Sequence, residues 1–256
     1  MTAAGAPERV AKRIARSGLC SRRDAERLIA AGRVAVDGEV LTSPALSVTE
    51  VNLVTVDGEP LPTPEQPRLF RYHKPAGVLT AARDPGGRPT IYDRLPEGLP
   101  RLMPIGRLDM ASEGLLLLTN DGALKRRLEL PATGWLRRYR VRVHGRIDEA
   151  KLRALGDGIE IDGFRYGPIQ ATLDRVQGSN AWLTVALREG KNREIRRVLE
   201  HFGWPVSRLI RLSFGPFQLG GLAAGAVEEV PPKVLREQLG ARLAPESRSR
   251  DERRVR

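Results

Sequence analysis

Asp109 is the residue of this sequence best suited to act as a catalytic carboxylate. It stands in the polar segment Gly106–Gly114, between Pro104-Ile105 and the apolar run Leu115–Leu118. A short loop against a hydrophobic strand would hold the carboxylate half-buried at a fixed position, as acid–base or nucleophilic chemistry requires. Taken alone, an aspartate in a glycine-flanked loop is more often a turn residue. Ser112 is a weaker candidate nucleophile, because no histidine lies close to it in the sequence.

Other common chemistries have little support in the sequence. The three histidines, His73, His144 and His201, are far apart and lack the spacing of metal ligands. The single cysteine, Cys20, excludes an intramolecular disulfide and a clustered-cysteine metal site. The sequence has no Walker-type phosphate loop and no dinucleotide-binding glycine pattern. We therefore expect carboxylate chemistry without a metal ion or other cofactor.

Charge indicates the partner on which this carboxylate would act. The chain has 43 Lys and Arg residues against 31 Asp and Glu residues, a net charge of +12, and only six of the basic residues are Lys. The planar guanidinium group of Arg is suited to phosphates and to stacking on bases. A GC-rich genome would also favour Arg over Lys, but it would not explain the net excess of positive charge. We expect a nucleic-acid partner.

No segment of the sequence suggests a membrane or an export route. There is no run of about 18 apolar residues, the length that a transmembrane helix requires. The first residues lack the basic-then-apolar layout of a secretion signal. We therefore expect a cytoplasmic protein without a membrane partner.

The first sixty residues have the pattern of a small helix–hairpin module. Apolar spacing predicts a helix over Glu8–Ser17, which Gly18 ends. Ser21 has the position of an N-cap for a second helix, which ends at Gly32. Asp37-Gly38 is a typical hairpin turn, and a second Val-Asp-Gly at residues 56–58 predicts another short β element.

This module is strongly basic. Between Arg9 and Arg33 there are eight Lys and Arg residues against Asp24 and Glu26, a net +6. Such a face suits the phosphates of folded RNA, and Arg16, Arg22 and Arg23 are our candidate contacts. A solvated helix face is the alternative interpretation. The stretches at residues 15–26 and 32–38 resemble the S4 RNA-binding domain.

Proline spacing and composition predict the domain limits. Four prolines, at positions 60, 62, 64 and 67, forbid a helix and favour an extended connector. We expect an S4-like domain at residues 8–62, a linker at 63–68, a catalytic domain at 69–235 and a disordered basic tail at 236–256. The tail could attract RNA non-specifically or be inert.

The central region predicts an α+β domain with a mainly antiparallel sheet. The apolar composition of Leu115–Thr119 predicts a buried strand. In Tyr139–His144 and Trp182–Leu187, apolar and polar residues alternate with the period of two typical of half-buried strands. Asn192 can cap a helix over Arg193–Phe202, which Gly203 ends.

Several ordered segments of the chain resemble the RsuA-type family of ribosomal RNA pseudouridine synthases. They are His73–Thr80, Gly106–Asp109 with Ser112, Gly114–Gly122, Arg138–Val141 and Glu189–Arg197. Together with the S4-like module, the resemblance covers most of the chain. Within the family, residues 83–96 are most similar to the RluB-like branch, which acts on the large ribosomal subunit.

The resemblance implies a reaction and a set of site residues. The family converts uridine in RNA to pseudouridine without a cofactor, and its essential aspartate corresponds to Asp109. Arg196 corresponds to the cation expected to pair with that carboxylate, and Tyr139 to the tyrosine that stacks on the flipped-out base. Arg107 is expected to hold the target nucleotide extruded. Further expected roles are an apolar wall for Ile195 and RNA-backbone contacts for Lys74, Lys191 and Arg193.

The resemblance also limits the partners. We expect ribosomal RNA as substrate, with 23S favoured over 16S, either naked or in an assembly intermediate, and a monomeric enzyme. A non-catalytic RNA-binding or ribosome-assembly protein and a nucleosidase that stops after glycosidic cleavage are the alternatives.

Overall fold

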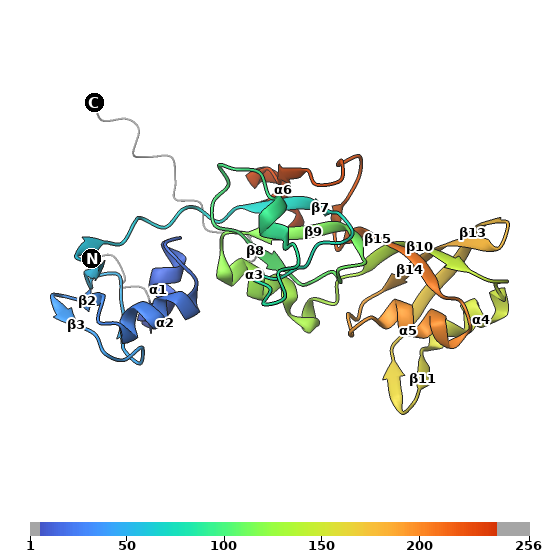
Figure 1. The fold of residues 1–256 in the computed structure, drawn as a ribbon, viewed down its shortest axis with the longest axis horizontal. Helices are drawn as coiled ribbons and strands as arrows, with labels where there is room; N and C mark the ends of the chain where they lie inside the picture. Colours follow the sequence, from blue (N-terminus) through green and yellow to red (C-terminus); the bar gives the residue numbers. More distant parts are fainter. Residues whose placement is uncertain (1–5, 240–256) are drawn as a thin grey trace. The chain divides into compact units, whose positions relative to one another are not determined.

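The computed structural model describes residues 6–239, which divide into two compact units (Figure 1). Unit 1 contains the chain up to Pro67 together with Pro100–Met103 and Asn120–Gly122, and unit 2 contains the rest. The proline-rich residues 61–68 form neither helix nor strand, as their spacing predicts. The sequence did not predict the two short segments that join unit 1, and the predicted domain limits stay predictions. Within residues 6–239, no helix has both the length and the apolar character that crossing a bilayer requires.

Unit 1 contains two helices and six short strands around a small apolar core. The helices are α1 (Val10–Arg16) and α2 (Arg22–Ala30). The strands are β1 (Glu8–Arg9), β2 (Val34–Val36), β3 (Glu39–Val40), β4 (Ser47–Val48), β5 (Val54–Val56) and β6 (Glu59–Pro60). Four of the strands form one sheet in the order β3-β2-β5-β6, and β1 pairs with β4.

The structure confirms the helix cap and the turns predicted for unit 1, but it corrects the start of the first helix. The backbone N–H of Asp24 donates to the Ser21 hydroxyl at 3.0 Å, which confirms the predicted N-cap of α2. Asp37 and Asp57 have φ near +50° in the two Asp-Gly turns. The first helix begins at Val10 rather than at Glu8, because Glu8 and Arg9 pair with Val48 and Ser47 as a strand.

Unit 2 is organised by a nine-stranded sheet with the order β13-β14-β10-β15-β9-β7-β17 along its main path. Its strands are β7 (Leu69–Lys74), β8 (Met103–Ile105), β9 (Glu113–Thr119), β10 (Arg137–His144), β13 (Ile169–Gln177), β14 (Asn180–Leu187), β15 (Val206–Phe214), β16 (Phe217–Gln218) and β17 (Val227–Glu229). Along the main path and in the pairing of β15 with β16, neighbouring strands are antiparallel except β9 and β15, which run parallel. The expected α+β class with a mainly antiparallel sheet is confirmed.

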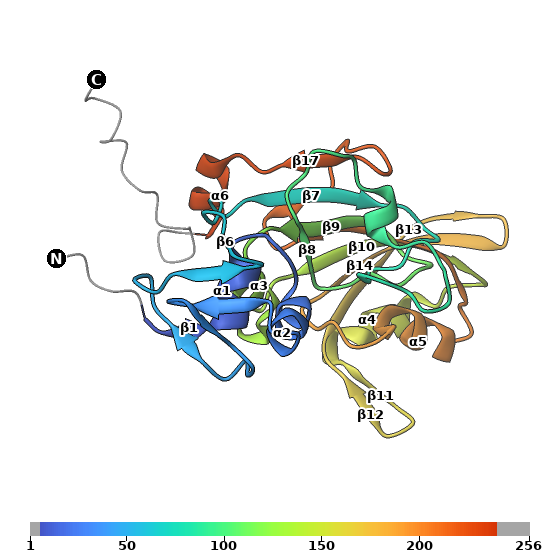
Figure 2. The same ribbon diagram turned by 60° about the vertical axis from the view of Figure 1, so that its left-hand side comes forward.

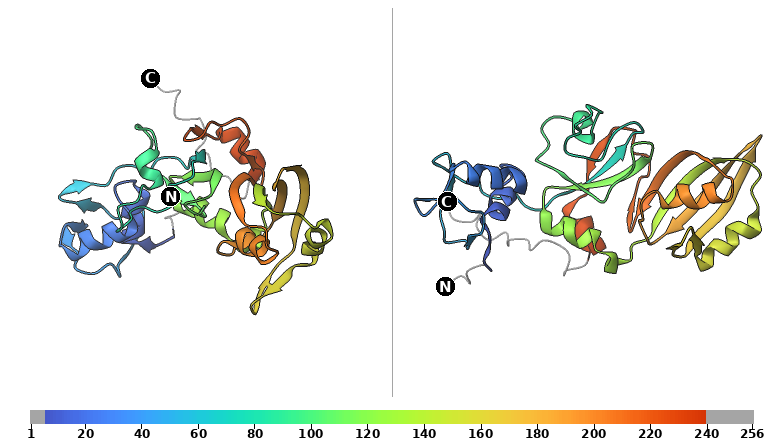
Figure 3. Two further views of the ribbon diagram at one scale, coloured as in Figure 1. Left: turned by 45° about the vertical axis from the view of Figure 1, so that its right-hand side comes forward. Right: turned by 60° about the horizontal axis from the view of Figure 1, so that its bottom comes forward.

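Helices cover different parts of this sheet. They are α3 (Gly122–Glu129), α4 (Glu149–Ala154), α5 (Glu194–His201) and α6 (Pro232–Leu239), with 3-10 turns at Ile91–Arg94, Pro131–Thr133 and Leu155–Asp157. Apolar residues of α3 and α6 share one core cluster with Leu115 and Leu117 of β9. Figures 1 and 2 show α4 and α5 on one side of β10, β13 and β14. A separate hairpin of β11 (Ile159–Ile161) and β12 (Phe164–Tyr166) projects from the unit (Figure 3).

Two helix predictions are corrected by the structure. The N-cap of α5 is Arg193, with φ of 51°, and not Asn192. The helix therefore starts at Glu194 and ends before Phe202 and Gly203. Residues 236–239, which we assigned to a disordered tail, belong to α6, where the buried side chains of Leu235 and Leu239 join the core. The remainder of the predicted tail, 240–256, lies outside the described residues.

Candidate active site

One row of residues crosses five neighbouring strands of unit 2. Val185 of β14 lies opposite Tyr139 of β10, and Tyr139 lies opposite Arg211 of β15. Arg211 in turn is in register with Gly114 of β9, which pairs with Lys74 of β7. Because paired residues project from the same face of a sheet, the Tyr139, Arg211 and Lys74 side chains share one face. Lys74, Gly114 and Tyr139 come from three of the segments that resemble the family, and they thus meet in one row.

Gly114 makes this row possible. A Cβ atom at this position would lie 2.4 Å from the carbonyl oxygen of Arg211, closer than any real contact. Its φ of +103° is also unfavourable for residues with side chains. Only glycine therefore lets β15 come this close to the strand that follows the Asp109 loop.

The loop that carries Asp109 is held by two buried cations. Lys74 is completely buried, and its Nζ donates to the carbonyl oxygens of Asp109, Met110 and Ser112 at 3.2, 3.5 and 2.8 Å. The Nη2 of Arg196 donates to the carbonyl of Ala111 at 3.0 Å. All four consecutive carbonyls of residues 109–112 therefore accept from a cationic side chain.

Further hydrogen bonds complete this restraint. The Ser112 N–H donates to the Asp109 carbonyl at 2.9 Å, and the Gly77 N–H donates to Met110 at 2.7 Å. The Thr80 hydroxyl donates to the carbonyl of Leu108 at 2.8 Å. The backbone around Asp109 is thus fixed by β7, the loop after it and α5, while the Asp109 side chain remains half-exposed.

Lys74 requires a correction. We expected it to contact the RNA backbone, but it is inaccessible and its ammonium group is already bound by protein carbonyls, including that of Pro75 at 3.0 Å. Burial lowers the pKa of Lys74 to about 8, and attraction to Asp109 and Glu113 opposes part of that fall. Its place in the structure is that of a support for the Asp109 loop.

Arg196 lies beside the same loop but does not form the expected ion pair. Within the described residues, no contact of 4 Å or less joins its guanidinium to the Asp109 carboxylate. Its Nη1 donates to the Val206 carbonyl at 2.8 Å, so both ends of the fork are bound by backbone oxygens. Burial lowers the pKa of Arg196, and Asp109 acts in the opposite direction. The attraction between the two charges therefore acts without a direct salt bridge.

Arg211 is a site residue that sequence reasoning missed. It is only 2% exposed, and its Nε donates to the Leu115 carbonyl at 2.7 Å. Its Nη2 has no hydrogen-bond partner among residues 6–239. Burial lowers the pKa of Arg211, while attraction to Tyr139 raises it. Tyr139 itself is 9% exposed. A signal existed, because Leu209, Arg211 and Ser213 recur with the period of a buried strand face.

The loop before α5 places the remaining residues of the Glu189–Arg197 segment. Ile195 is buried, whereas Arg193 and Lys191 are exposed. The Lys191 ammonium group pairs with Glu189 at 3.0 Å. Glu194, which we had not singled out, is 4% exposed and accepts from the Lys191 N–H at 2.9 Å. Burial raises the pKa of Glu194 to about 7.

The remaining candidates are exposed arginines. Arg107, in the Asp109 segment, and Arg22 and Arg23, on α2, are exposed and make no ion pair within residues 6–239. Arg16 on α1 is held by Glu8 at 2.7 Å. These four guanidinium groups remain predicted RNA contacts.

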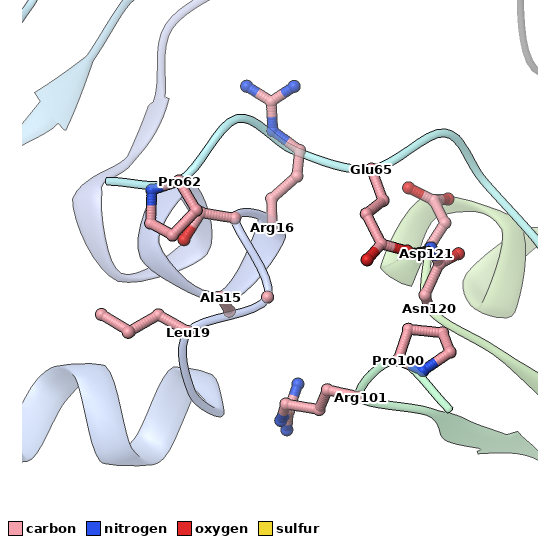
Figure 4. A pocket seen from close by; sticks show the side chains of 11 residues that line it. Ala15, Arg16, Leu19, Pro62, Glu65, Pro100, Arg101, Asn120 and Asp121 are labelled. Atoms are coloured by element: carbon pink, nitrogen blue, oxygen red, sulfur yellow. Dashed lines mark hydrogen bonds between the residues drawn. The ribbon is translucent and has the colours of Figure 1, made fainter. Parts of the chain in front are cut away.

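Unit 1 contains a pocket of about 260 Å³ (Figure 4). It is lined by residues 15–19, Pro62, Glu65, Pro100, Arg101, Asn120 and Asp121. Of the predicted RNA contacts it includes only Arg16, and its lining carries both signs of charge. Within residues 6–239, no three His, Cys, Asp or Glu side chains gather as a metal ion would require. The expectation of a cofactor-independent reaction stays a prediction.

Comparison with known proteins identifies both parts of the chain. The family model described as RNA pseudouridylate synthase matches residues 68–201, and the S4 domain model matches residues 8–54. The chain is 46% identical over 228 residues to a protein of Rickettsia felis named "Uncharacterized RNA pseudouridine synthase", covering 89% of this chain and 99% of that protein.

Two further similarities agree with this result. The "Ribosomal large subunit pseudouridine synthase B" of Salmonella typhi is 41% identical over 87% of this chain and 79% of its own length. A solved structure titled "Crystal structure of pseudouridylate synthase" matches with a TM-score of 0.61 and 26% identity, over 88% of this chain and 96% of that one. The predicted family and the predicted S4 domain are both confirmed: the chain belongs to the RNA pseudouridylate synthase family and carries an N-terminal S4 domain.

Proposed function

We propose that this enzyme isomerises a specific uridine of 23S ribosomal RNA to pseudouridine, without a cofactor and with Asp109 as the catalytic carboxylate. The large-subunit name of the Salmonella relative supports 23S over 16S RNA as the substrate. The enzyme acts as a monomer, on free ribosomal RNA or on an assembly intermediate. The single observation that carries the choice of Asp109 is the restraint of its loop by Lys74 and Arg196.

The reaction needs no external reactant. The N1–C1′ bond of uridine breaks, the uracil turns, and a C5–C1′ bond forms; C5 loses a proton and N1 gains one, so mass is unchanged. Attack on the sugar, addition to the base and removal of a sugar proton all require an ionised carboxylate held beside the nucleotide. The hydrogen-bonded backbone of residues 109–112 keeps the Asp109 carboxylate in a constant position for this step.

The other residues divide into substrate contacts and supports. The Tyr139 ring stacks on the flipped uracil, a contact that stabilises by about 1–3 kcal/mol in other nucleic-acid complexes. Ile195 forms an apolar wall, and Arg107 holds the nucleotide out of its stack. Lys191, Arg193 and the arginines of the S4 domain contact the RNA backbone. Lys74, Arg196 and Arg211 are positioning residues, because their polar atoms bind the protein itself.

The decisive experiment is a pseudouridine map of both ribosomal RNAs from cells that lack this protein. Add-back of the wild type should restore one 23S position, whereas Asp109→Asn should restore none. Asp157→Asn, a change at an exposed aspartate of unit 2, is the matched control and should restore it fully. Restoration in 16S RNA would overturn the substrate, and a fully active Asp109→Asn would overturn the catalytic assignment.

Purified protein separates chemistry from binding. Asp109→Asn should bind the RNA fragment with nearly unchanged Kd, because the amide keeps the size of the side chain. Conversion in a single turnover should fall by about 10³-fold or more, the effect of removing an essential catalytic group. A loss of affinity equal to the loss of rate would show that Asp109 serves binding alone.

A further inference from the structure

The sheet of unit 2 has a second, open face on the far side of β10 from Tyr139. Along β10, buried Tyr139, Val141 and Val143 alternate with Arg138, Arg140 and Arg142. Arg138 and Arg140 are exposed and Arg142 is half-exposed. Because strand side chains alternate between faces, the three arginines project together, about 6.8 Å apart along the strand. Figures 1 and 2 show α4 and α5 on one side of these strands only.

The neighbouring strands add to this surface without neutralising it. Arg142 lies opposite Trp182 of β14, and Trp182 lies opposite Arg175 of β13. The guanidinium carbon of Arg140 is 4.8 Å from the centre of the half-buried Trp182 ring. We call the set Arg138, Arg140, Arg142, Arg175 and Trp182 the β10 outer face.

Two acidic groups lie near this face, and neither pairs with its three β10 arginines. Asp174 accepts a hydrogen bond from the Thr184 hydroxyl at 3.0 Å, and Glu113 pairs with Arg208 at 2.6 Å. Within residues 6–239, none of Arg138, Arg140 and Arg142 has an ion-pair partner. A solvated strand face would normally place acids opposite the bases, as cross-strand pairs are stabilising. Here the residues opposite Arg140 and Arg142 are Thr184 and Trp182 on β14, and Ile210 and Arg208 on β15, none of them acidic.

We propose that the β10 outer face is an RNA-docking surface, which binds the phosphate backbone of the substrate away from the target nucleotide. The proposal rests on the proposed function, because it assigns this second contact to the same RNA. Unpaired guanidinium groups in a row complement a phosphate chain, and the flat Trp182 ring beneath Arg140 keeps one of them in place. Since Arg138 and Arg140 flank Tyr139 in sequence, one rigid strand would connect the docked backbone to the base-stacking site.

RNA suits this surface better than an acidic protein does. Protein interfaces are centred on apolar and aromatic anchors, whereas phosphate contacts are made by exposed arginines and polar groups. Around the arginines the face offers Thr184, Thr172 and His144, which are polar, and no exposed large aliphatic side chain at its centre.

The test compares two triple variants of the full chain that lose equal charge. In the first, Arg138, Arg140 and Arg142 are each replaced by Gln; in the control, the exposed Arg126, Arg127 and Arg153 are replaced by Gln. The probes are a long 23S fragment and a minimal stem-loop with the same target uridine. The first variant should bind the long fragment about 10-fold or more weakly, with a salt slope lower by about 2–3. Binding of the stem-loop and turnover at saturating RNA should match the control.

Different results would contradict the docking surface and the proposed enzymatic function. Equal affinity and equal salt slope for the two triple variants would overturn the docking surface and leave an acidic protein as the alternative partner. Absence of turnover by the wild type would instead contradict the proposed function. If the triple variant does not fold, a single Arg140→Gln variant should still lower the salt slope by about 1, and an unchanged slope would overturn the proposal.

Discussion

Two groups of cations in this enzyme have the same charge and opposite surroundings. Lys74, Arg196 and Arg211 are at most 6% exposed and bind backbone carbonyls of the protein. Arg22 and Arg23 of the S4 domain are exposed and have no ion-pair partner within the described residues. The first group is nearly inaccessible to a ligand, whereas the side chains of the second group are exposed to solvent.

Burial therefore determines whether a positive charge in this enzyme supports the protein or attracts RNA. A buried cation interacts strongly with nearby groups because little water screens it, so it can fix the backbone of a loop. An exposed cation contributes little to stability but attracts RNA, with an effect that salt screens. Substitutions in the first group should therefore change the rate of the reaction, and substitutions in the second group should change affinity.

Lys74→Met should give the largest effect in this comparison. Methionine fills a similar volume but leaves the carbonyls of Asp109, Met110 and Ser112 without their buried donor, which loosens the Asp109 loop. Small misplacements of reacting groups cost on the order of 10²-fold in rate, so kcat should fall by about that factor. Single-turnover conversion measures it, and Lys233→Met, at an exposed lysine, should remain active. A Lys74→Met enzyme with normal kcat and weaker RNA binding would restore the RNA-contact role that we rejected.

Arg211→Lys should give the next largest effect. The substitution keeps the charge but loses the guanidinium Nε that donates to the Leu115 carbonyl. We expect kcat to fall by about 10-fold with KM nearly unchanged. Arg208→Lys, on the same strand but exposed, is the control. A change in KM alone would show that Arg211 does not position the site.

The double substitution of Arg22 and Arg23 by Gln should act on affinity. Kd for the RNA should rise about 3- to 10-fold and the salt slope should fall by up to about 2, while kcat at saturating RNA stays unchanged. Arg33→Gln is an informative control, because its guanidinium is already bound to Asp57 at 2.6 Å. An effect of Arg33→Gln as large as that of the pair would contradict the distinction between partnered and free arginines.

Glu194→Gln should give the smallest effect, which appears in the pH dependence of stability. Burial raises the pKa of Glu194 from its ordinary 4.5 to about 7, so between these values the folded protein binds more protons than the unfolded chain. The free energy of unfolding should therefore decrease as pH rises from about 4.5 to 7. The Gln variant should lose part of that decrease, on the order of 1 kcal/mol. Urea unfolding at several pH values measures this free energy. The exposed Glu26→Gln variant is the control and should have the pH dependence of the wild type. If Glu194→Gln also has the pH dependence of the wild type, Glu194 does not have a raised pKa in the folded protein.

Local features of this fold could be predicted from sequence because their causes are local. The Ser21 cap depends on a residue three positions away, and the Asp37-Gly38 turn depends on two adjacent residues. The alternation of Tyr139–His144 and Trp182–Leu187 correctly indicated strands. The α5 cap was predicted wrongly, since Asn192 has the preferred side chain but Arg193 has the left-handed conformation at that position.

The site could be predicted only in part, because its contacts join distant segments. Resemblance indicated Asp109, Tyr139 and Arg196, and the structure gathers them around one loop and one row of the sheet. The resemblance did not indicate that Lys74 would donate to carbonyls 35 to 38 positions away, or that Arg211 would lie beside Gly114. The resemblance predicted a direct Asp109–Arg196 pair, but the guanidinium donates to backbone oxygens instead.

The sequence by itself determined the family, the α+β class, the basic character of the chain and the residue types available for chemistry. Tertiary structure alone decided which of the many positive charges are buried and which remain free for RNA. The physical reason is that burial depends on strand register: the pairing of β7, β9, β15 and β10 sets Lys74 and Arg211 on one closed face. The same pairing turns Arg138, Arg140 and Arg142 to the other, open face.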